Sequence, residues 1–472
     1  MTDLAAITLA AGLGTRMRSK RAKVLHQIAG ETMLARSLRP IVVLGASPII
    51  VVVGNQADEV RAAAISAFPK TELRFALQSR QLGTGHAARC ALPELPEDFR
   101  GDVLLGYGDL PAVTVETLRR FLSQHRENRA PVSFITFRAA NPAAYGRVIR
   151  VSGQVDEIVE ARDASPVQLK INEVNSGVYL VKSNFLRDAL PRLSAQNAQG
   201  EYYLTDLVKM AREQRLQVDA FVADHETEFA GINSREELAQ MESQVRNQNV
   251  RKLMSSGVTV IDPPTCYVGD EVEIGADTVI GPNVQIWGKS RIGSNVRIEG
   301  TAWLRDVVVG DRCHIKLGVR AEECHIGEDS DIGPFANLRA GTELEGHNRV
   351  GNFVETKKAR LGRGAKASHL SYLGDTTIGS GTNIGCGVIT VNYDGYDKHE
   401  TLVGDRCMVG CDTQFVAPVK IGSDVYVASG TTIIRDVPDG SLVMSHHPQR
   451  EKAGWMAGFH KRHAGRKPWW EK

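Results

Sequence analysis

Residues 274–304 decide the fold of the C-terminal half, and they read IGADTV-IGPNVQ-IWGKSR-IGSNVR-IEGTAW-L. An aliphatic residue stands at every sixth position, in one register that begins at Val268 and reaches Leu304. The register slips by one residue at Val309 and Ile315. It resumes at Ile326, Ile332, Leu338, Leu344 and Val350, then at Leu361, Ile378 and Ile384, and finally at Val403, Val409, Phe415, Ile421, Val427 and Ile433. A hexapeptide repeat of this kind predicts a parallel β-helix whose short strands each point one aliphatic side chain into the axis.

Glycine usage places the start of this repeat. The chain has 45 glycines in 472 residues, of which 15 lie in residues 1–256 and 27 in residues 257–440. Glycine permits the tight corners between strands, where φ is positive. The repeat is therefore expected to begin near Gly257. Residues 389–402 break the period, and a loop that leaves a rigid scaffold is a favoured place for functional groups.

The first 230 residues have a different pattern, in which apolar runs alternate with helical spacing. Helical spacing appears in 85–92 and 114–125. This alternation predicts a mostly parallel, doubly wound sheet with helices on both faces. The predicted strands are Ala5–Leu9, Ile49–Val53, Leu73–Leu77, Val103–Gly106, Val132–Thr136 and Gly177–Val181.

A helix is predicted between these two regions. Ser234-Arg235-Glu236-Glu237 has the S-x-x-E pattern of a capping box, and Leu238, Met241, Val245 and Leu253 follow at helical spacing. We therefore expect a first, α/β domain at 1–232, a linker helix at 233–256, a β-helix domain at 257–440 and a basic tail at 441–472.

Composition excludes several classes of protein. The formal net charge is only +2, which gives no reason to expect a nucleic-acid partner. The longest uncharged run, residues 40–56, is too short and too interrupted for a membrane span, and the start of the chain lacks the basic region of a signal peptide. We therefore expect a cytoplasmic protein without a membrane partner.

The seven cysteines are too sparse for a disulfide scaffold. Two Cys-His pairs, at 313–314 and 324–325, invite a zinc interpretation. Zinc sites usually pair their ligands about two to four positions apart, so buried thiols are the better interpretation.

A glycine loop follows the first predicted strand. It reads Leu9-Ala-Ala-Gly12-Leu-Gly14-Thr-Arg16-Met17, with Lys23 downstream. The loop matches neither the GxGxxG fingerprint nor the P-loop. Its backbone N–H groups and two nearby cations nevertheless suit a nucleoside triphosphate.

Three motifs together resemble those of the sugar-nucleotide pyrophosphorylases. They are the loop at 9–17 with Lys23-Val-Leu-His26, then Gln78-x-x-Gln81-Leu-Gly-Thr84-Gly-His-Ala, then Tyr107-Gly108-Asp109. Joined to a hexapeptide β-helix, residues 4–440 resemble the bifunctional GlmU family. The resemblance implies an α/β nucleotidyltransferase domain, a linker helix and a left-handed parallel β-helix. It also implies acetylation of glucosamine 1-phosphate by acetyl-CoA, followed by UMP transfer from UTP to N-acetylglucosamine 1-phosphate.

The resemblance implies a UDP-N-acetylglucosamine site in the first domain. Its uridine and phosphate contacts would be Leu9, Ala10, Ala11, Gly12, Lys23, Gln78, Gly83, Thr84, Tyr107 and Gly108, and its sugar contacts Gly146, Glu160 and Asn175. Asp109 and Asn233 would also contact the ligand and carry one or two Mg²⁺ ions, since oxygen ligands suit this cation. Arg16 and Lys23 would neutralise charge on the phosphates during catalysis.

The resemblance also implies an acetyltransferase site on the β-helix. His369 would be the general base, because imidazole titrates near neutrality, and Glu355 would orient it. The sugar phosphate would be held by Arg339, Lys357, Tyr372, Asn383 and Lys398. Acetyl-CoA would be held by Cys386, Asn392, Tyr393, Cys411, Ser429 and His446. Three β-helices packed side by side would place these groups between chains, so a homotrimer is implied.

Four positions depart from the family pattern. Ala22 stands where the family usually has proline, Cys411 where it has serine, Ser429 where alanine is common and His446 where arginine often meets coenzyme A phosphates. A thiol is a weaker hydrogen-bond donor than a hydroxyl. We therefore expect acetyl transfer to survive with weaker or altered coenzyme A binding, compensated by the basic tail.

Three alternatives remain open from the sequence alone. In the first, the chain is a sugar-1-phosphate nucleotidyltransferase whose β-helix is only regulatory or trimerising. In the second, it is a sugar-nucleotide-binding scaffold without activity. Cys411 would, in a third reading, carry the acetyl group as a nucleophile. The presence of Arg16, Lys23, Asp109 and Asn233 disfavours the scaffold, and the residues around His369 disfavour the regulatory β-helix.

Overall fold

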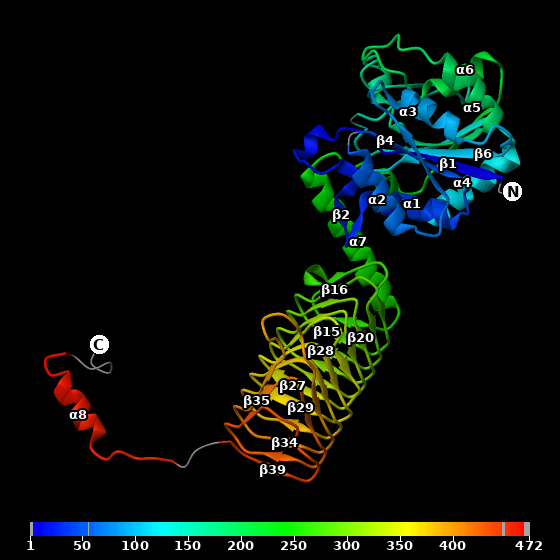
Figure 1. Ribbon diagram of the computed structural model, residues 1–472. Helices are drawn as coiled ribbons and strands as arrows, with labels where there is room; N and C mark the ends of the chain where they lie inside the picture. The colour runs from blue at the N-terminus through cyan, green and yellow to red at the C-terminus, as the bar shows by residue number, and fades with distance from the viewer. Residues whose placement is uncertain (1–2, 55, 143, 446–448, 467–472) are drawn as a thin grey trace. The chain divides into compact units, whose positions relative to one another are not determined.

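The computed structural model describes residues 3–54, 56–142, 144–445 and 449–466 (Figure 1). The chain separates into two compact units, Met1–Asn249 and Val250–Lys472. The hydrophobic core residues of the two units form separate clusters.

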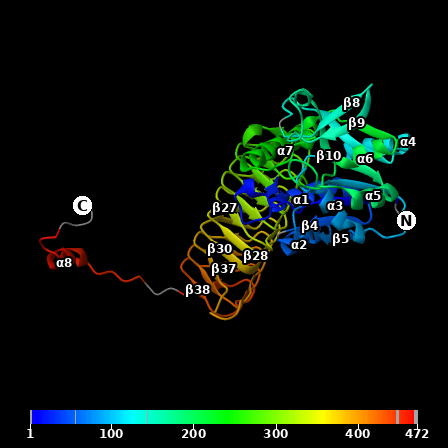
Figure 2. The same ribbon diagram turned by 90° about the horizontal axis from the view of Figure 1, so that it is seen from above.

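The first unit is built on a mixed sheet with the strand order β11-β7-β10-β6-β1-β4-β5, of which β4, β5 and β10 are labelled in Figure 2. Neighbours are parallel except at β10, which pairs antiparallel with both β6 and β7. All six predicted strands are present. The bounds are β1 Leu4–Leu9, β4 Ile49–Val53, β5 Leu73–Leu77, β6 Asp102–Tyr107, β7 Val132–Arg138, β10 Glu173–Lys182 and β11 Val218–Val222.

Helices cover both faces of this sheet. Successive side chains of β1 point to opposite faces, so Leu4 and Ala6 join one core while Ala5 and Ile7 join the other. The first core is covered by α1 (Met33–Val43), α2 (Ala57–Ala67) and α4 (Val115–Asn128), and the second by α3 (Thr84–Ala91), α5 (Ser183–Ala189) and α6 (Asp206–Glu213). The doubly wound architecture predicted from the sequence is confirmed.

Some small elements were not predicted. A short hairpin joins β2 (Gln27–Ile28) to β3 (Glu31–Thr32), and a longer one joins β8 (Arg147–Val151) to β9 (Gln154–Val159). The longer hairpin mixes apolar with charged residues without a regular alternation, and it attaches to β10. Its weak hydrophobic signal explains why sequence periodicity did not separate it from a loop. It leads directly into Glu160.

Helix α7 (Arg235–Ser255) begins at the predicted capping box. The Glu237 N–H donates to Ser234 Oγ at 3.1 Å, and the Ser234 N–H donates to Glu237 Oε2 at 3.0 Å. Met241 and Val245 pack with Ile232 in the first unit, whereas Val250 belongs to the core of the second. The division between the units therefore falls inside this helix.

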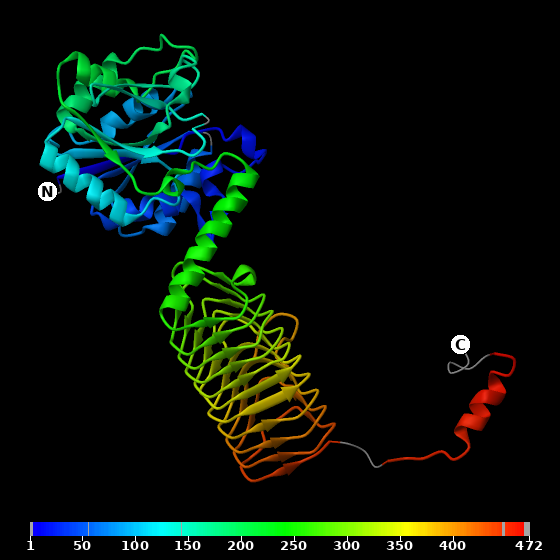
Figure 3. The same cartoon turned by 180° about the vertical axis from the view of Figure 1, so that it is seen from behind.

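The second unit is a left-handed parallel β-helix, seen as a stack of short strands in Figure 3. One face contains β12 Thr259–Val260, β15 Val279–Ile280, β18 Arg297–Ile298, β21 His314–Ile315, β24 Asp331–Ile332, β27 Arg349–Asn352, β29 Lys366–His369, β31 Asn383–Ile384, β34 Met408–Val409, β37 Tyr426–Val427 and β39 Leu442–Val443. A second face contains β13 Tyr267–Val268, β16 Gln285–Trp287, β19 Trp303–Arg305, β22 Arg320–Glu322, β25 Asn337–Leu338, β32 Ile389–Val391, β35 Gln414–Val416 and β38 Thr432–Ile433.

The third face contains β14 Glu273–Ile274, β17 Arg291–Ile292, β20 Val308–Val309, β23 His325–Ile326, β26 Glu343–Leu344, β33 Thr401–Val403 and β36 Val419–Ile421. Strands β28 (Glu355–Leu361) and β30 (Tyr372–Ile378) are longer, and each pairs with strands of both the second and third faces.

Coil length explains the irregularities of the repeat. Ile274 pairs with Ile292, eighteen residues on, but Ile292 pairs with Val309, seventeen residues on. The slip in the sequence pattern is thus a coil one residue shorter. Thr390 pairs with Phe415, because the chain leaves the prism as a loop between β32 and β33. Five further interior positions were not recognised from the aliphatic pattern. All five are buried, and all except Leu373 are smaller residues: Ala321, Thr356, Ala367, Leu373 and Thr390.

Beyond the β-helix, the described tail contains α8 (Trp455–Arg462), which has no buried residues. His446, Lys467 and Lys472 lie outside the described residues. Among the residues that the structure describes, no helix is long and apolar enough to cross a membrane.

Candidate active sites

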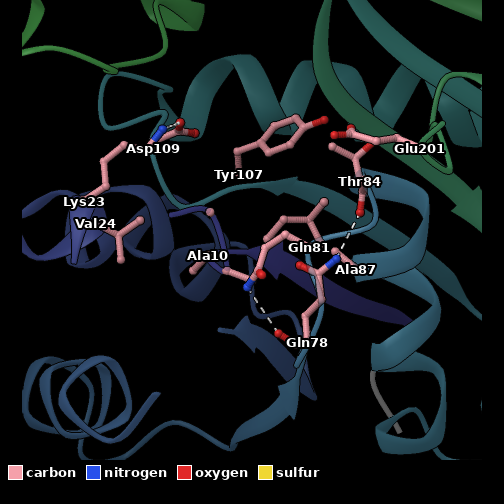
Figure 4. A pocket seen from close by; sticks show the side chains of 14 residues that line it. Ala10, Lys23, Val24, Gln78, Gln81, Thr84, Ala87, Tyr107, Asp109 and Glu201 are labelled. Atoms are coloured by element: carbon pink, nitrogen blue, oxygen red, sulfur yellow. Dashed lines mark hydrogen bonds and ion pairs between the residues drawn. The ribbon is translucent and has the colours of Figure 1, made fainter. Parts of the chain in front are cut away.

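A cavity of about 270 Å³ opens at the carboxyl ends of β1 and β6 (Figure 4). Strand β1 pairs with β4 on one side and β6 on the other, so the cavity lies where the strand order reverses, as expected for a ligand site in an open α/β sheet. The lining contains the predicted residues Leu9, Ala10, Ala11, Gly12, Lys23, Gln78, Gly83, Thr84, Tyr107 and Asp109.

The glycine loop is held against Lys23 by its backbone. Gly14 has a φ of 59°, and a Cβ added there would lie 2.7 Å from the Lys23 Cβ. The Gly108 N–H donates to the Leu9 carbonyl at 2.9 Å, which places Asp109 beside the end of β1. A residue with a side chain at position 14 would therefore displace the lysine from the cavity.

Lys23, Asp109 and Asn233 meet at one point. The Lys23 ammonium pairs with the Asp109 carboxylate and donates to Asn233 Oδ1 at 3.0 Å. The backbone fixes this arrangement, because the Ile232 N–H donates to the Asp109 carbonyl at 3.3 Å and Glu237 accepts the Asn233 N–H.

This donor set fits Mg²⁺. A carboxylate and an amide oxygen already converge on one cationic group, which stands in for a metal ion, and both are hard oxygen ligands. Occupancy by a metal would require the lysine to turn toward the phosphates of the ligand.

Gln78 and Thr84 are held at the other end of the cavity. Gln78 is only 4% exposed, and its Nε2 donates to the Gly83 carbonyl at 3.1 Å. Thr84 Oγ1 accepts the Leu204 N–H at 3.0 Å, so its hydroxyl is anchored to the segment before α6. Gly83 has a φ of 102°, and a Cβ there would meet the Tyr202 carbonyl at 2.6 Å.

The predicted sugar-binding residues gather beside this cavity. The Asn175 N–H donates to the Gly146 carbonyl at 2.9 Å, and a Cβ on Gly146 would lie 3.6 Å from the Glu160 carboxyl carbon. Burial raises the pKa of Glu160, against a hydrogen bond from Thr205 that lowers it. Burial is also the main cause that raises the pKa of Tyr107, followed by the charges of Glu160 and Asp109.

Two aspects of the cavity differ from the sequence prediction. Arg16 is exposed on the short helix η1 (Thr15–Met17) and is not part of the lining. The lining also contains Val24, Gln81, Ala87 and Glu201, which were not assigned as site residues. Glu201 has no local sequence signal; it reaches the cavity because residue 202 pairs with the backbone of residues 82 and 85.

On the β-helix, five residues stand above one another along one edge, which we call the corner column: Asn352, His369, Cys386, Cys411 and Ser429. Each lies two residues after a paired interior position, namely Val350, Ala367, Ile384, Val409 and Val427. Backbone hydrogen bonds join successive coils here, such as the Asp412 N–H to the Cys386 carbonyl at 2.7 Å. The β-helix thus brings His369 into line with three of the predicted acetyl-CoA-binding positions.

Two of the predicted phosphate-binding cations lie on adjacent coils, Lys357 on β28 and Arg339 directly after β25, which pairs with β28. Arg339 is exposed and donates to Glu355 Oε1 at 2.7 Å, and Lys357 is half-buried on β28. Glu355 was expected to orient His369. In the structure Glu355 Oε1 instead accepts a hydrogen bond from Arg339, so the carboxylate positions that guanidinium.

The loop between β32 and β33 carries the remaining predicted groups. Asn392 is buried and donates to Asp375 Oδ2 at 2.5 Å, while the Tyr372 hydroxyl lies close to it beside Gly374. The Lys398 ammonium lies 4.6 Å from the centre of the Tyr393 ring. Asn383 is on β31, where its Nδ2 lies 3.5 Å from Met408 Sδ.

These β-helix groups are open to solvent. His369, Arg339, Tyr393, Lys398, Cys411 and Ser429 are all exposed. His446 lies outside the described residues, so the structure gives no position for the predicted phosphate contact.

Comparisons with known proteins cover nearly the whole chain. Residues 6–210 match the model of the MobA-like NTP transferase domain. The chain is 46% identical over 463 residues to the bifunctional protein GlmU of Pelobacter propionicus, covering 98% of this chain and 100% of that protein. It is 45% identical to the GlmU of Trichlorobacter lovleyi (96% and 98%) and 41% identical to that of Corynebacterium diphtheriae (96% and 94%).

Proposed function

The chain belongs to the bifunctional GlmU family, and on that premise we propose that it makes UDP-N-acetylglucosamine in two reactions at two separate sites. The β-helix acetylates glucosamine 1-phosphate with acetyl-CoA. The first unit then transfers UMP from UTP to N-acetylglucosamine 1-phosphate and releases pyrophosphate.

The cavity of the first unit carries the proposal for UMP transfer. A phosphate oxygen of the sugar phosphate attacks the α-phosphorus of UTP, and the bond to the β-phosphate oxygen breaks with its electron pair on pyrophosphate. No protein nucleophile is needed, so positioning and charge neutralisation carry the reaction. Lys23 supplies a cation beside the glycine loop, and Arg16, exposed on η1 of the same loop, would supply a second.

Asp109 and Asn233 would hold Mg²⁺, which neutralises phosphate charge when bound. Gln78, Gly83 and Thr84 face the uracil, and Gly146, Glu160 and Asn175 face the sugar. Pyrophosphate release from UTP and N-acetylglucosamine 1-phosphate, measured with and without Mg²⁺, tests this function. No release under either condition would exclude it.

The corner column carries the proposal for acetyl transfer. His369 takes the proton from the amine of glucosamine 1-phosphate as the nitrogen attacks the thioester carbonyl, and it passes this proton to the departing sulfur as the C–S bond breaks, so coenzyme A leaves as the thiol. Arg339, Lys357 and Lys398 meet the sugar phosphate, with Tyr372 and Asn383 on the sugar. Asn392, Tyr393, Cys386, Cys411 and Ser429 lie along acetyl-CoA.

The exposure of these groups supports a homotrimer in which the β-helix of a neighbouring chain covers the corner column. The proposal is tested by sedimentation velocity and by acetyltransferase activity per chain over a dilution series. Activity per chain should fall as the trimer dissociates, while UMP transfer stays constant. A monomer with full acetyltransferase activity would exclude a shared site.

A nucleotidyltransferase with a merely regulatory β-helix is not favoured, because the full-length relatives are bifunctional proteins and the acetyltransferase residues fall into register. We place the enzyme in the cytoplasm, without nucleic-acid or membrane partners. Its co-substrates are UTP and acetyl-CoA.

A further inference from the structure

His86 contacts the side chain of Gln78, one of the residues that line the cavity. It lies in the first turn of α3, and its Nδ1 is 3.1 Å from Gln78 Nε2. The same Gln78 nitrogen donates to the Gly83 carbonyl, also at 3.1 Å. The buried amide therefore donates one N–H to the Gly83 carbonyl, and its second N–H has an acceptor in the imidazole ring when His86 is neutral with its proton on Nε2.

This pair of contacts fixes which way the amide points. If the amide were turned over, its oxygen would face the Gly83 carbonyl and the imidazole lone pair, and acceptors do not bond acceptors. Among the described residues, no N–H or O–H group donates to Gln78 Oε1, and Gln78 lines the cavity (Figure 4). An acceptor is thus left for a ligand.

We propose that His86 is a positioning residue for uridine: its Nδ1 accepts an amide N–H of Gln78 and so holds Oε1 as an acceptor for N3–H of uracil. We call the two hydrogen bonds that orient the Gln78 amide the lock. Cytosine has a lone pair at N3, which Oε1 would repel, so the lock also selects UTP over CTP. This inference rests on the proposed UTP site and adds the group that sets its base selectivity.

The surroundings of His86 favour the neutral ring that this role requires. Burial lowers the pKa of His86, and the Arg89 cation lowers it further, against a backbone contact with Arg80 that raises it. The other titratable groups that face the ring are the Cys90 thiol, 3.9 Å from Nε2, and Tyr202, whose ring centre is 6.2 Å away. Protonation would turn Nδ1 into a donor and break the lock.

Two variants of the full-length chain test the lock. His86→Ala removes the acceptor while keeping a residue that favours helices, and His86→Asn keeps an oxygen acceptor near the position of Nδ1. Affinities for UTP and CTP, measured calorimetrically with Mg²⁺ and no sugar phosphate, need no catalysis.

We expect His86→Ala to weaken UTP binding about tenfold, as for one lost hydrogen bond, and to reduce the preference for UTP over CTP. His86→Asn should restore both. In wild type, UTP affinity should also fall as pH drops through the lowered pKa of His86, and this change should be absent in His86→Asn.

The lock is overturned if His86→Ala keeps the UTP/CTP ratio of wild type, or if His86→Asn loses as much affinity as His86→Ala. Failure of the proposed function is a different result. Wild type would then bind UTP selectively but produce no UDP-N-acetylglucosamine, and the lock would stand.

Discussion

In the first unit, Lys23, Gln78 and Thr84 line one cavity formed by segments that are far apart in the chain. In the β-helix, His369, Cys411 and Ser429 stand on an exposed edge, at positions that recur coil by coil. A layered α/β unit closes a site with its own loops. A repeat structure presents its groups in a line and needs another surface to enclose them, because each coil contacts only its neighbours.

The largest expected effect separates the two sites completely. His369→Ala should lower acetyltransferase kcat by about 10²–10⁴-fold, because a general base contributes that much, and leave UMP transfer unchanged. Two assays on one preparation measure this: coenzyme A thiol release and pyrophosphate release. Acetyl transfer at the wild-type rate would exclude His369 as the general base and would argue against the corner column as the acetyltransferase site.

The reciprocal change acts in the cavity. Asp109→Asn removes the carboxylate that faces Lys23 and the expected metal, so UMP transfer should fall about 10²–10³-fold. Acetyl transfer should persist at its wild-type rate. Titration with Mg²⁺ gives a second readout, since the variant should need a higher concentration. Equal loss of both activities would contradict two independent sites.

A third prediction concerns stability rather than chemistry. Asp102 is 3% exposed and is bonded by His125 at 3.2 Å and Lys182 at 2.6 Å, and these partners hold its pKa well below the usual range against the effect of burial. Its stabilising contribution is therefore present above the ordinary aspartate pKa near 4 and is lost as pH falls further.

Asp102→Asn should lower the free energy of unfolding of the first unit by about 3 kcal/mol at neutral pH, with a smaller difference in acid. The β-helix, which does not contain this cluster, should unfold as in wild type. Thermal unfolding of the full chain, followed with a probe for each unit, would reveal this. An identical stability loss at pH 3 and pH 7 would contradict the ionic cause.

The smallest effect tests how tightly the cavity is closed. Gly83→Ala places a Cβ within 2.6 Å of the Tyr202 carbonyl at a φ of 102°, so the segment around Glu201 must shift. We expect the KM for UTP to rise about tenfold with acetyl transfer unchanged. Gly106→Ala is the control for thermal stability, because a Cβ there meets nothing within 4 Å. An unchanged KM would mean that the cavity tolerates movement at this edge.

Much of the fold was predictable because its signals are local. The strand β1 was predicted as 5–9 and is Leu4–Leu9, and the capping box of α7 forms as its spacing indicates. The hairpin of β8 and β9 was not predicted, because its stability comes from pairing with β10 rather than from its own pattern. Glu201 was not predicted either, because it reaches the cavity only through backbone contacts between residue 202 and residues 82 and 85.

The β-helix follows from local sequence alone, because a six-residue period repeats one local geometry until the core is continuous. The order of strands and helices along the chain also follows from it and, by resemblance, so do most cavity residues. Three contacts became visible only in the folded chain: Lys23 stands between Asp109 and Asn233, Glu355 pairs with Arg339, and Gln78 contacts His86. These contacts join residues through folded backbone and side-chain orientation, which no periodicity records.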